Sequence, residues 1–308
     1  MRCYQRHPFR PPPRVGAPNT PDTLSGVPHL LDSHFDDLRR RRANLYKRWD
    51  RSQGARKSRA LLTYVHNEPV FFPIWLGYYS RFFAPEDIYV LDHDTTDGSL
   101  SGSGFVRIPV SHPSVDNQWF VRIAEEHQHE LIERYDVVVV TDSDEIIAPD
   151  PRWGTLGDYI DRIDEKFVTC YGHELLHMRD EEPPYDADRP VMDQRSYWYE
   201  NGLYDKPSIA MAPMEWVVGF HTPVDGSVNF DPDLYLIHLH RMDYDVCLER
   251  HRLRNRRPWN PKDVQLQWGR QNLIVEDEEF DRWFYQESLL DDCPIVLERI
   301  PEYWRGTF

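Results

Sequence analysis

Hydrophobic runs and helical patterns alternate in the first half of the chain beyond residue 60. Apolar stretches that predict strands cover 60–65, 88–91, 105–110 and 136–141. Helical patterns cover 69–83, with Pro69 in the first turn, and 116–135, with Asp116 as the expected N-cap. The unbroken run Val137–Val140 is typical of a parallel strand covered on both faces. The order therefore predicts an α/β fold, a mostly parallel Rossmann-like sheet with crossover helices.

The second half is less regular. It predicts a helix at 155–163, a strand at 167–171 and a polar loop at 181–195. Short strands are expected at 209–211, 216–219 and 235–239, followed by helices at 244–254 and 277–286. There is no internal repeat, so one domain over 60–308 is expected: a nucleotide-binding half at about 60–150, an acceptor half at about 151–260, and C-terminal helices at 261–308.

The first 59 residues differ in character from the rest. Residues 1–28 are rich in Pro, Arg and Gly and predict a disordered tail. Residues 29–59 predict a basic helix followed by a polar linker. The helix contains Arg39–Arg42, which fits a solvated face or a peripheral contact with anionic lipid.

Composition narrows the function classes. The net charge is −16, from 36 basic and 52 acidic residues in 308, which disfavours a non-specific nucleic-acid binder. The four cysteines show no CxxC or other zinc-like spacing, so a reducing compartment is expected. With neither a signal-type apolar segment nor a run of 18 apolar residues, we expect a soluble, cytoplasmic protein.

Two acidic segments each follow a predicted strand. Asp142 and Asp144 follow the valine run at spacing i, i+2, and Asp92 ends the strand at 88–91. Ligands of open α/β sheets bind at the carboxyl ends of the strands. Carboxylates there can hold Mg²⁺ or Mn²⁺ together with a phosphorylated ligand. An acidic turn without a ligand is the alternative.

Other candidates at the same sheet edge are weaker. His66, Asn67 and Glu68 end the first strand and fit either a nucleotide pocket or a helix cap. In the turn after Asp92, Asp94 and Asp97 precede Gly98 and fit ribose contacts or an Asx turn.

The later part of the chain adds basic and imidazole side chains. His238 and His240 lie on the same side of a strand, and His238 is the favoured metal ligand. Lys206 and His221 are candidates for donor contacts, and the basic run 251–257 is a candidate for a diphosphate or an anionic acceptor. Each of these residues also fits a structural role.

These pieces, in this order, resemble a glycosyltransferase of the GT-A fold. The strand–HNE–helix opening, YVLDHDTTDGS and VVVVTDSDE resemble the family 2 pattern, and KPSI, GFH and HLHR resemble the family 92-like branch, over about residues 60–255. The resemblance implies a nucleotide-sugar donor, a saccharide or other hydroxyl acceptor, and Mn²⁺ or Mg²⁺. It also implies that Asp92 contacts the nucleotide, Asp142 the ribose or metal, Asp144 and His238 the metal, and that His221 belongs to the site.

The sequence departs from the family pattern in two places. His93 and Asp94 replace an acidic residue and a glycine, and no Glu-Asp base motif is present, so Glu215 and Asp225 are the available base candidates. Two other functions stay open. One is a metal-dependent phosphohydrolase or sugar nucleotidyltransferase, although HNEPVFF is not a Gly-rich phosphate loop. The other is a non-catalytic nucleotide-sugar-binding protein.

Overall fold

The computed structural model describes residues 56–286 and 295–308. The predicted tail at 1–28 and the predicted helix with Arg39–Arg42 lie outside the described residues. Among the described helices, none is long and apolar enough to cross a membrane.

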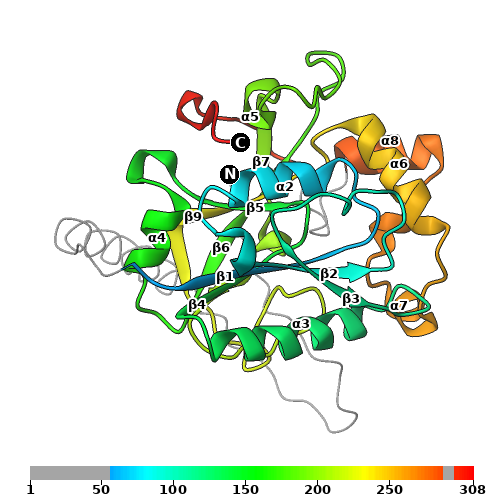
Figure 1. The fold of residues 1–308 in the computed structure, drawn as a ribbon. Coiled ribbons are helices and arrows are strands. Elements are labelled where there is room, and N and C mark those ends of the chain that lie inside the picture. The colour runs from blue at the N-terminus through cyan, green and yellow to red at the C-terminus, as the bar shows by residue number, and fades with distance from the viewer. Residues whose placement is uncertain (1–55, 287–294) are drawn as a thin grey trace, which may run out of the picture. The chain divides into compact units, whose positions relative to one another are not determined.

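Four parallel strands form the first half of the sheet, in the order β4-β1-β2-β3. They are β1 (Arg59–Val65), β2 (Ile88–His93), β3 (Val106–Val110) and β4 (Val137–Val140). Helices α2 (Phe71–Tyr79) and α3 (Asn117–Ile132) cover opposite faces (Figure 1). The central strands β1, β2 and β4 are almost wholly buried, as the hydrophobic runs require. The predicted α/β fold with a parallel sheet flanked by helices is therefore confirmed.

The second half extends this sheet with antiparallel pairs. Strand β8 (Lys206–Ala210) pairs with β4, and β6 (Phe167–Leu175) pairs with β8 and with β7 (Tyr197–Glu200). Strand β9 (Phe230–His238) runs parallel to β6 and antiparallel to β5 (Glu145–Pro149), and β10 (Glu298–Arg299) borders β7. This arrangement brings the end of β9 beside the start of β5, directly after the acidic turn.

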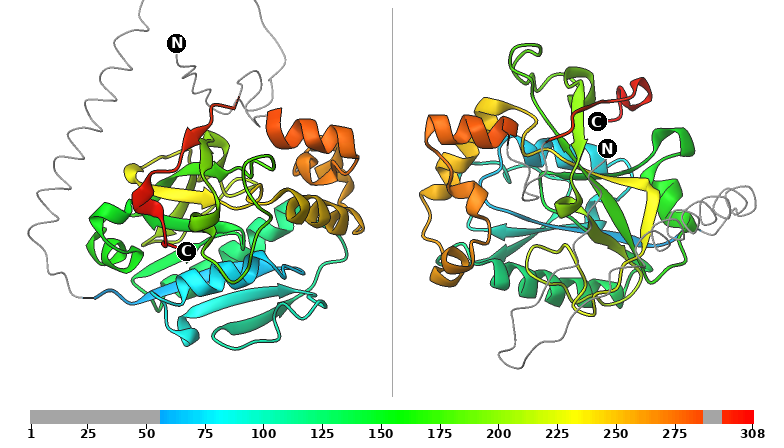
Figure 2. Two further views of the ribbon diagram at one scale, coloured as in Figure 1. Left: turned by 90° about the horizontal axis from the view of Figure 1, so that it is seen from above. Right: turned by 180° about the vertical axis from the view of Figure 1, so that it is seen from behind.

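The remaining helices are α4 (Leu156–Arg162), α5 (Val191–Gln194), α6 (Tyr244–Asn255), α7 (Pro261–Leu266) and α8 (Asp277–Gln286). Helices α6, α7 and α8 lie on the side toward which β2 points (Figures 1 and 2). Contacts fix them there: Val115 bridges Trp259, and Nη2 of Arg257 lies 3.2 Å from Nε2 of His93. The C-terminal helices therefore cover the sheet edge at which ligands of α/β proteins bind.

An aromatic cluster fixes α2 to the sheet. The indole Nε1 of buried Trp75 donates to Oγ1 of Thr141 at 2.8 Å, and the hydroxyl of Tyr78 donates to the carbonyl of Ile147 at 2.8 Å. Buried aromatic side chains contribute a large apolar area while their polar atoms still find partners. The turn after β4 is thus held from the core side.

The structure differs locally from the prediction in several places. The helix predicted at 69–83 ends at Tyr79, because hydrogen bonds from Arg81 to Tyr78 and from Phe82 to Tyr79 tighten the chain into turns. The strand predicted at 216–219 is wrong: Trp216 makes a single bridge to Pro223, and the chain reverses through Gly219 and Phe220 at φ of 91° and 63°. Strand β5 was not predicted, because its pairing with β9 is long-range.

Candidate active site

The acidic turn lies between β4 and β5, at the carboxyl end of β4. The backbone N–H of Asp142 donates to Oε2 of Glu145 at 3.1 Å, and the N–H of Leu239 donates to the carbonyl of Asp144 at 2.8 Å. Both ends of the turn are thereby tied to neighbouring strands. The position predicted for Asp142 and Asp144 is the one the structure gives them.

Asp144 is the centre of a buried ion cluster. Its Oδ2 accepts a hydrogen bond from Nη1 of Arg250 and lies 3.4 Å from Nε2 of His238 and 3.7 Å from Nδ1 of His240. Burial opposes ionisation of this carboxyl, but Arg250 and His238 outweigh it and hold the pKa of Asp144 well below its usual value. Asp144 is therefore a carboxylate, as a metal ligand has to be.

Lys206 faces Asp142 from strand β8. Its Nζ lies 2.8 Å from Oδ2 of Asp142 and 2.5 Å from Oε1 of Glu145. Burial would raise the pKa of Asp142, but Lys206 outweighs it and the pKa is lowered. Burial, together with the charge of Asp142, raises the pKa of Glu145 to about 7. The Lys206 ammonium thus contacts a half-buried carboxyl group, that of Asp142, and a buried one, that of Glu145.

His238 is oriented by a carboxylate on β6. Its Nδ1 donates to Oε2 of Glu174 at 2.9 Å, so Nε2 faces Asp144, and the ring of Tyr204 lies against it at an interplanar angle of 31°, with centroids 4.0 Å apart. Burial opposes protonation, but Glu174 and Asp144 outweigh it and raise the pKa of His238 to about 10. A raised pKa favours a protonated His238 paired with Asp144, so a cation bound to Nε2 would have to displace that proton.

These donors fit a divalent cation. The ligand atoms of Asp144, His238 and His240 lie within 4.8 Å of one another, and all three side chains are buried. A carboxylate oxygen and imidazole nitrogen suit Mn²⁺, and the hydrogen bond from His238 to Glu174 is the support that metal-bound histidines usually have. The guanidinium of Arg250 already shares Oδ2 of Asp144, so a cation there competes with it.

A small pocket lies beside Asp142. Its lining includes Tyr64, Lys206 and Phe220. His221 lies next to Phe220, and its Nδ1 is buried with no hydrogen-bond partner among the described residues. Burial, followed by the Lys206 ammonium, lowers the pKa of His221 to about 3. His221 therefore lies near Asp142 and Lys206, and its predicted contact with the donor stays a prediction.

The segment after β1 joins neighbouring loops to one another. Nδ1 of His66 lies 2.5 Å from the carbonyl of His93, and Oδ1 of Asn67 accepts from the N–H of Thr96 at 2.8 Å. Oε1 of Glu68 accepts from Nε of Arg250 at 3.0 Å. All three side chains therefore have structural partners at the sheet edge, and their predicted donor contacts stay predictions.

The turn after β2 is held by its own acidic residues. Asp92 accepts from the N–H of Thr95 at 2.9 Å and from Nε of Arg107 at 2.8 Å. Asp94 accepts from Oγ of Ser111 at 2.8 Å, and Asp97 accepts from the N–H of Ser99 at 2.9 Å, as an Asx turn does. These bonds correspond to the structural alternative. They leave the predicted nucleotide contact of Asp92 and the ribose contacts of Asp94 and Asp97 untested.

Glu215 and Asp225 lie on the loop between β8 and β9. Both side chains are exposed, and Asp225 accepts from Oγ and the N–H of Ser227. Within the part of the chain that the structure describes, no hydrogen bond or ion pair joins either residue to Asp142 or Asp144. Their role as catalytic base stays a prediction.

Sequence reasoning missed Arg250, Glu145 and Glu174. Arg250 and Arg254 both bond Glu68, and their i, i+4 spacing on a helix was the available signal. Glu145 directly follows the acidic motif. Glu174 lies in a strand that was predicted to end at Tyr171, and nothing in the sequence pairs it with His238, 64 residues away.

Comparisons with known proteins find a likeness among solved structures only. No protein-family model and no curated protein matches the chain. Among solved structures, it is similar to a mannosyltransferase from Pyrobaculum calidifontis in complex with GDP-mannose and Mn²⁺. That likeness has a TM-score of 0.34 and 13% sequence identity, and it covers 82% of each chain. A TM-score this low, at this identity, establishes neither a common fold nor a common activity.

Proposed function

We propose that the protein is a glycosyltransferase that moves a sugar from a nucleoside-diphosphate sugar to an acceptor hydroxyl. The observation that carries the proposal is the group of half-buried Asp142 and buried Asp144, Lys206, His238 and Arg250 at the carboxyl end of β4, beside a small pocket. Two carboxylates held among cations and an imidazole suit a ligand that brings both a diphosphate and a divalent ion. The resemblance of the motifs to GT-A glycosyltransferases points the same way.

The donor would lie across the ends of β2, β1 and β4. Neighbouring strands are about 4.8 Å apart, so the ends of β2 and β4 are about 10 Å apart across β1. In this proposal Asp92, with Asp94 and Asp97 in the same turn, contacts the nucleoside. Asp142 contacts the ribose or the metal, and Lys206 with His221 faces the diphosphate.

We assign Asp142, Asp144 and His238 as the residues that would hold Mn²⁺ or Mg²⁺. When bound, the ion would act as a Lewis acid that stabilises the charge developing on the leaving diphosphate. Lys206 and Arg250 place two further positive charges beside the same carboxylates and would stabilise that charge as well.

The proposed chemistry is one displacement at the anomeric carbon. The acceptor oxygen forms a bond to that carbon, the bond from carbon to the diphosphate oxygen breaks, and both electrons of that bond leave with the nucleoside diphosphate. The acceptor proton passes to a base, for which Glu215 and Asp225 are the candidates from sequence. In the inverting case this base acts on the face of the sugar opposite the leaving group.

The test is nucleotide release from a panel of nucleoside-diphosphate sugars, with Mn²⁺, Mg²⁺ or EDTA, with and without simple saccharide acceptors. We expect metal-dependent release from one donor. Asp144→Asn should reduce it by about 100-fold or more, because a Lewis-acid cation contributes several kcal/mol to the transition state. Asp188→Asn, at an exposed loop carboxylate, is the matched control and should leave release unchanged.

The alternatives give different outcomes in the same assay. Release of inorganic phosphate or pyrophosphate would indicate a phosphohydrolase or nucleotidyltransferase. Tight nucleotide binding without turnover on any donor and acceptor would indicate a binding protein. Release that survives Asp144→Asn would contradict the role of Asp144.

A further inference from the structure

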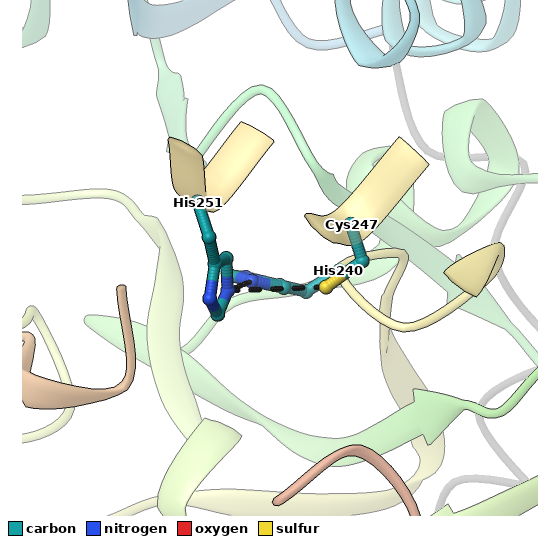
Figure 3. A group of neighbouring side chains, drawn as sticks. All are labelled: His240, Cys247 and His251. Atoms are coloured by element: carbon teal, nitrogen blue, oxygen red, sulfur yellow. Dashed lines mark hydrogen bonds between the residues drawn. The ribbon is translucent and has the colours of Figure 1, made fainter. Parts of the chain in front are cut away.

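A second group of side chains that can bind a metal ion lies next to Asp144 and shares His240 with the first group. It consists of His240, just after β9, and Cys247 and His251, which are one helical turn apart on α6 (Figure 3). Nε2 of His240 lies 2.7 Å from Nε2 of His251, and Sγ of Cys247 lies 3.8 Å from the same nitrogen. All three side chains are almost wholly buried, with exposed fractions of 4%, 0% and 0%.

Backbone and side-chain partners fix which ring nitrogens are free. Nδ1 of His251 lies 2.9 Å from the carbonyl of Ile274, which can only accept, so this nitrogen carries the proton and Nε2 presents a lone pair. Nδ1 of His240 faces Oδ2 of Asp144 at 3.7 Å. Without an ion, Nε2–H of His240 therefore donates to the lone pair of Nε2 of His251. If the His240 proton moves to Nδ1, toward Asp144, two lone pairs and the sulfur of Cys247 converge, and a cation can take the place of the shared proton.

We propose that His240, Cys247 and His251 form a binding site for a thiophilic divalent metal ion, with Zn²⁺ as the expected occupant. One thiolate and two neutral imidazoles are ligands that zinc prefers over Mg²⁺ or Ca²⁺. The bonds of His251 to Ile274 and of His240 toward Asp144 are the kind of support that metal-bound histidines have. This site is distinct from the one proposed at Asp142, Asp144 and His238.

The geometry needs only a small adjustment. Zn–N bonds of about 2.0–2.1 Å at a tetrahedral angle put two nitrogens about 3.3 Å apart, so the two imidazoles would separate by about 0.6 Å. A sulfur and a nitrogen on the same ion lie about 3.6 Å apart, close to the 3.8 Å between Cys247 and His251. The ion displaces the thiol proton to solvent, and the proton of His240 resides on Nδ1.

The titration behaviour of the three side chains agrees with this chemistry. Burial, together with the neighbouring His251 and Arg250, holds the pKa of His240 well below its usual value, and burial lowers the pKa of His251 to about 3. Both imidazoles are therefore neutral, as ligands must be. Burial raises the pKa of the Cys247 thiol, so zinc affinity should increase with pH.

Such an ion would connect the two proposed metal sites through one ring. His240 would give Nε2 to zinc and direct Nδ1–H toward Asp144, so His238 alone would supply an imidazole to a cation at Asp142 and Asp144. The ion would also fix α6, which carries Arg250, to the end of β9. This inference does not depend on glycosyl transfer, and it can fail or succeed separately.

The test uses the full chain and Co²⁺ as a spectroscopic substitute for Zn²⁺. Cys3 and Cys293 are first replaced by Ser, so that only Cys170 and Cys247 remain. We expect a thiolate-to-cobalt charge-transfer band in the near ultraviolet whose amplitude corresponds to one thiolate-bound Co²⁺ per chain, whether or not a second Co²⁺ binds at Asp142, Asp144 and His238. Cys247→Ala should abolish the band. Cys170→Ala, at an equally buried free cysteine, should retain it.

Two further measurements keep the outcome decisive. Asp142→Asn should keep the band, which separates this site from the proposed catalytic one. If Cys247→Ala does not fold, zinc-edge X-ray absorption of the unsubstituted chain replaces it, and should find one sulfur at about 2.3 Å and two imidazole nitrogens at about 2.0–2.1 Å. Absence of a thiolate band, a band that survives Cys247→Ala, or zinc with oxygen and nitrogen neighbours alone would overturn the proposal.

Discussion

Nζ of Lys206 donates a hydrogen bond of 2.8 Å to Oδ2 of Asp142, although the two residues are 64 positions apart in the sequence. The lysine comes from an antiparallel strand added to the parallel sheet, and the aspartate follows the parallel strand beside it. The Lys206 ammonium therefore lies beside Asp142, a carboxylate that the sequence predicts to be a ligand of a divalent cation. Lys206 and a divalent ion would compete for Asp142.

We expect Lys206→Met to tighten Mn²⁺ binding by on the order of tenfold, because a unit charge about 4 Å away opposes a cation by several kcal/mol before solvation offsets it. The same variant should weaken binding of a nucleoside diphosphate. Free Mn²⁺ measured by electron paramagnetic resonance gives the affinity. Lys166→Met removes an exposed lysine and controls for net charge. Unchanged or weaker Mn²⁺ binding would argue against Asp142 as a ligand.

Glu174 orients His238 and lies at 0% exposure. Its Oε2 accepts from Nδ1 of His238, and its Oε1 accepts from the N–H of Arg241 at 3.1 Å. We expect Glu174→Gln to weaken Mn²⁺ binding by about 10–100-fold, the usual effect of losing the carboxylate behind a metal-bound histidine. Calorimetric titration checks it, with Glu130→Gln on the exposed face of α3 as control. Equal affinities would mean that His238 is not a ligand.

Arg250 links Glu68 to Asp144, and all three side chains are buried. Arg250→Met removes the buried cation that Asp144 and Glu68 share and leaves only Arg254 beside Glu68 and His238 beside Asp144, which should lower the free energy of unfolding by about 3–5 kcal/mol. Arg252→Met is the control on the same helix. Its ion pair with Asp277 is largely exposed, with side-chain exposures of 45% and 84%, so about 1 kcal/mol or less is expected. Urea unfolding measures both, and similar losses in the two variants would refute the bridging role.

The sequence predicted well the elements that are set by local pattern. The run Val137–Val140 became a buried parallel strand, Asp116 became the N-cap of α3, and α8 spans the predicted 277–286. These features depend on residues that are close in the sequence, so periodicity and capping chemistry are enough to predict them.

The rest depends on pairs that are distant in sequence. Arg250 bonds Glu68 across 182 positions, and β5 exists because β9 pairs with it. In the sequence, the spacing of Cys247 and His251 does not point to His240. The three side chains meet because the end of β9 lies beside α6 in the fold. Packing determines such contacts, and one sequence does not reveal them.

Gly172 on β6 is in close contact with the backbone of Asn201 and Tyr204. A Cβ at this position would lie 2.5 Å from the carbonyl oxygen of Asn201 and 2.6 Å from the carbonyl carbon of Tyr204, whose ring contacts His238. We expect Gly172→Ala to lower the free energy of unfolding by about 1–3 kcal/mol. Gly77→Ala is the control, because its Cβ would meet nothing within 4 Å in α2 and should stabilise by up to about 1 kcal/mol. Thermal unfolding distinguishes them, and a neutral Gly172→Ala would contradict the close approach.

Asp116 gives α3 a stability that depends on pH. Its Oδ1 accepts from the N–H of Trp119 at 2.9 Å, and its Oδ2 accepts from Nδ2 of Asn260 at 2.6 Å. Burial opposes ionisation, but these bonds outweigh it and lower the pKa of Asp116. A folded pKa below the unfolded value of about 3.9 means that the carboxylate stabilises the fold above that pH, and that this stabilisation is lost as the pH falls toward the folded pKa.

Asp116→Asn tests this relation, because asparagine is an equally good N-cap that does not ionise. We expect the wild-type chain to exceed the variant by about 1 kcal/mol at pH 7, since a negative charge favours a helix N-terminus. The difference should shrink below about pH 4, as the carboxylate takes up its proton. Urea unfolding of both chains at pH 7 and near pH 3 measures it, with Asp188→Asn as the exposed control. A difference that stays constant over this range would mean that Asp116 acts through hydrogen-bond geometry and not through its charge.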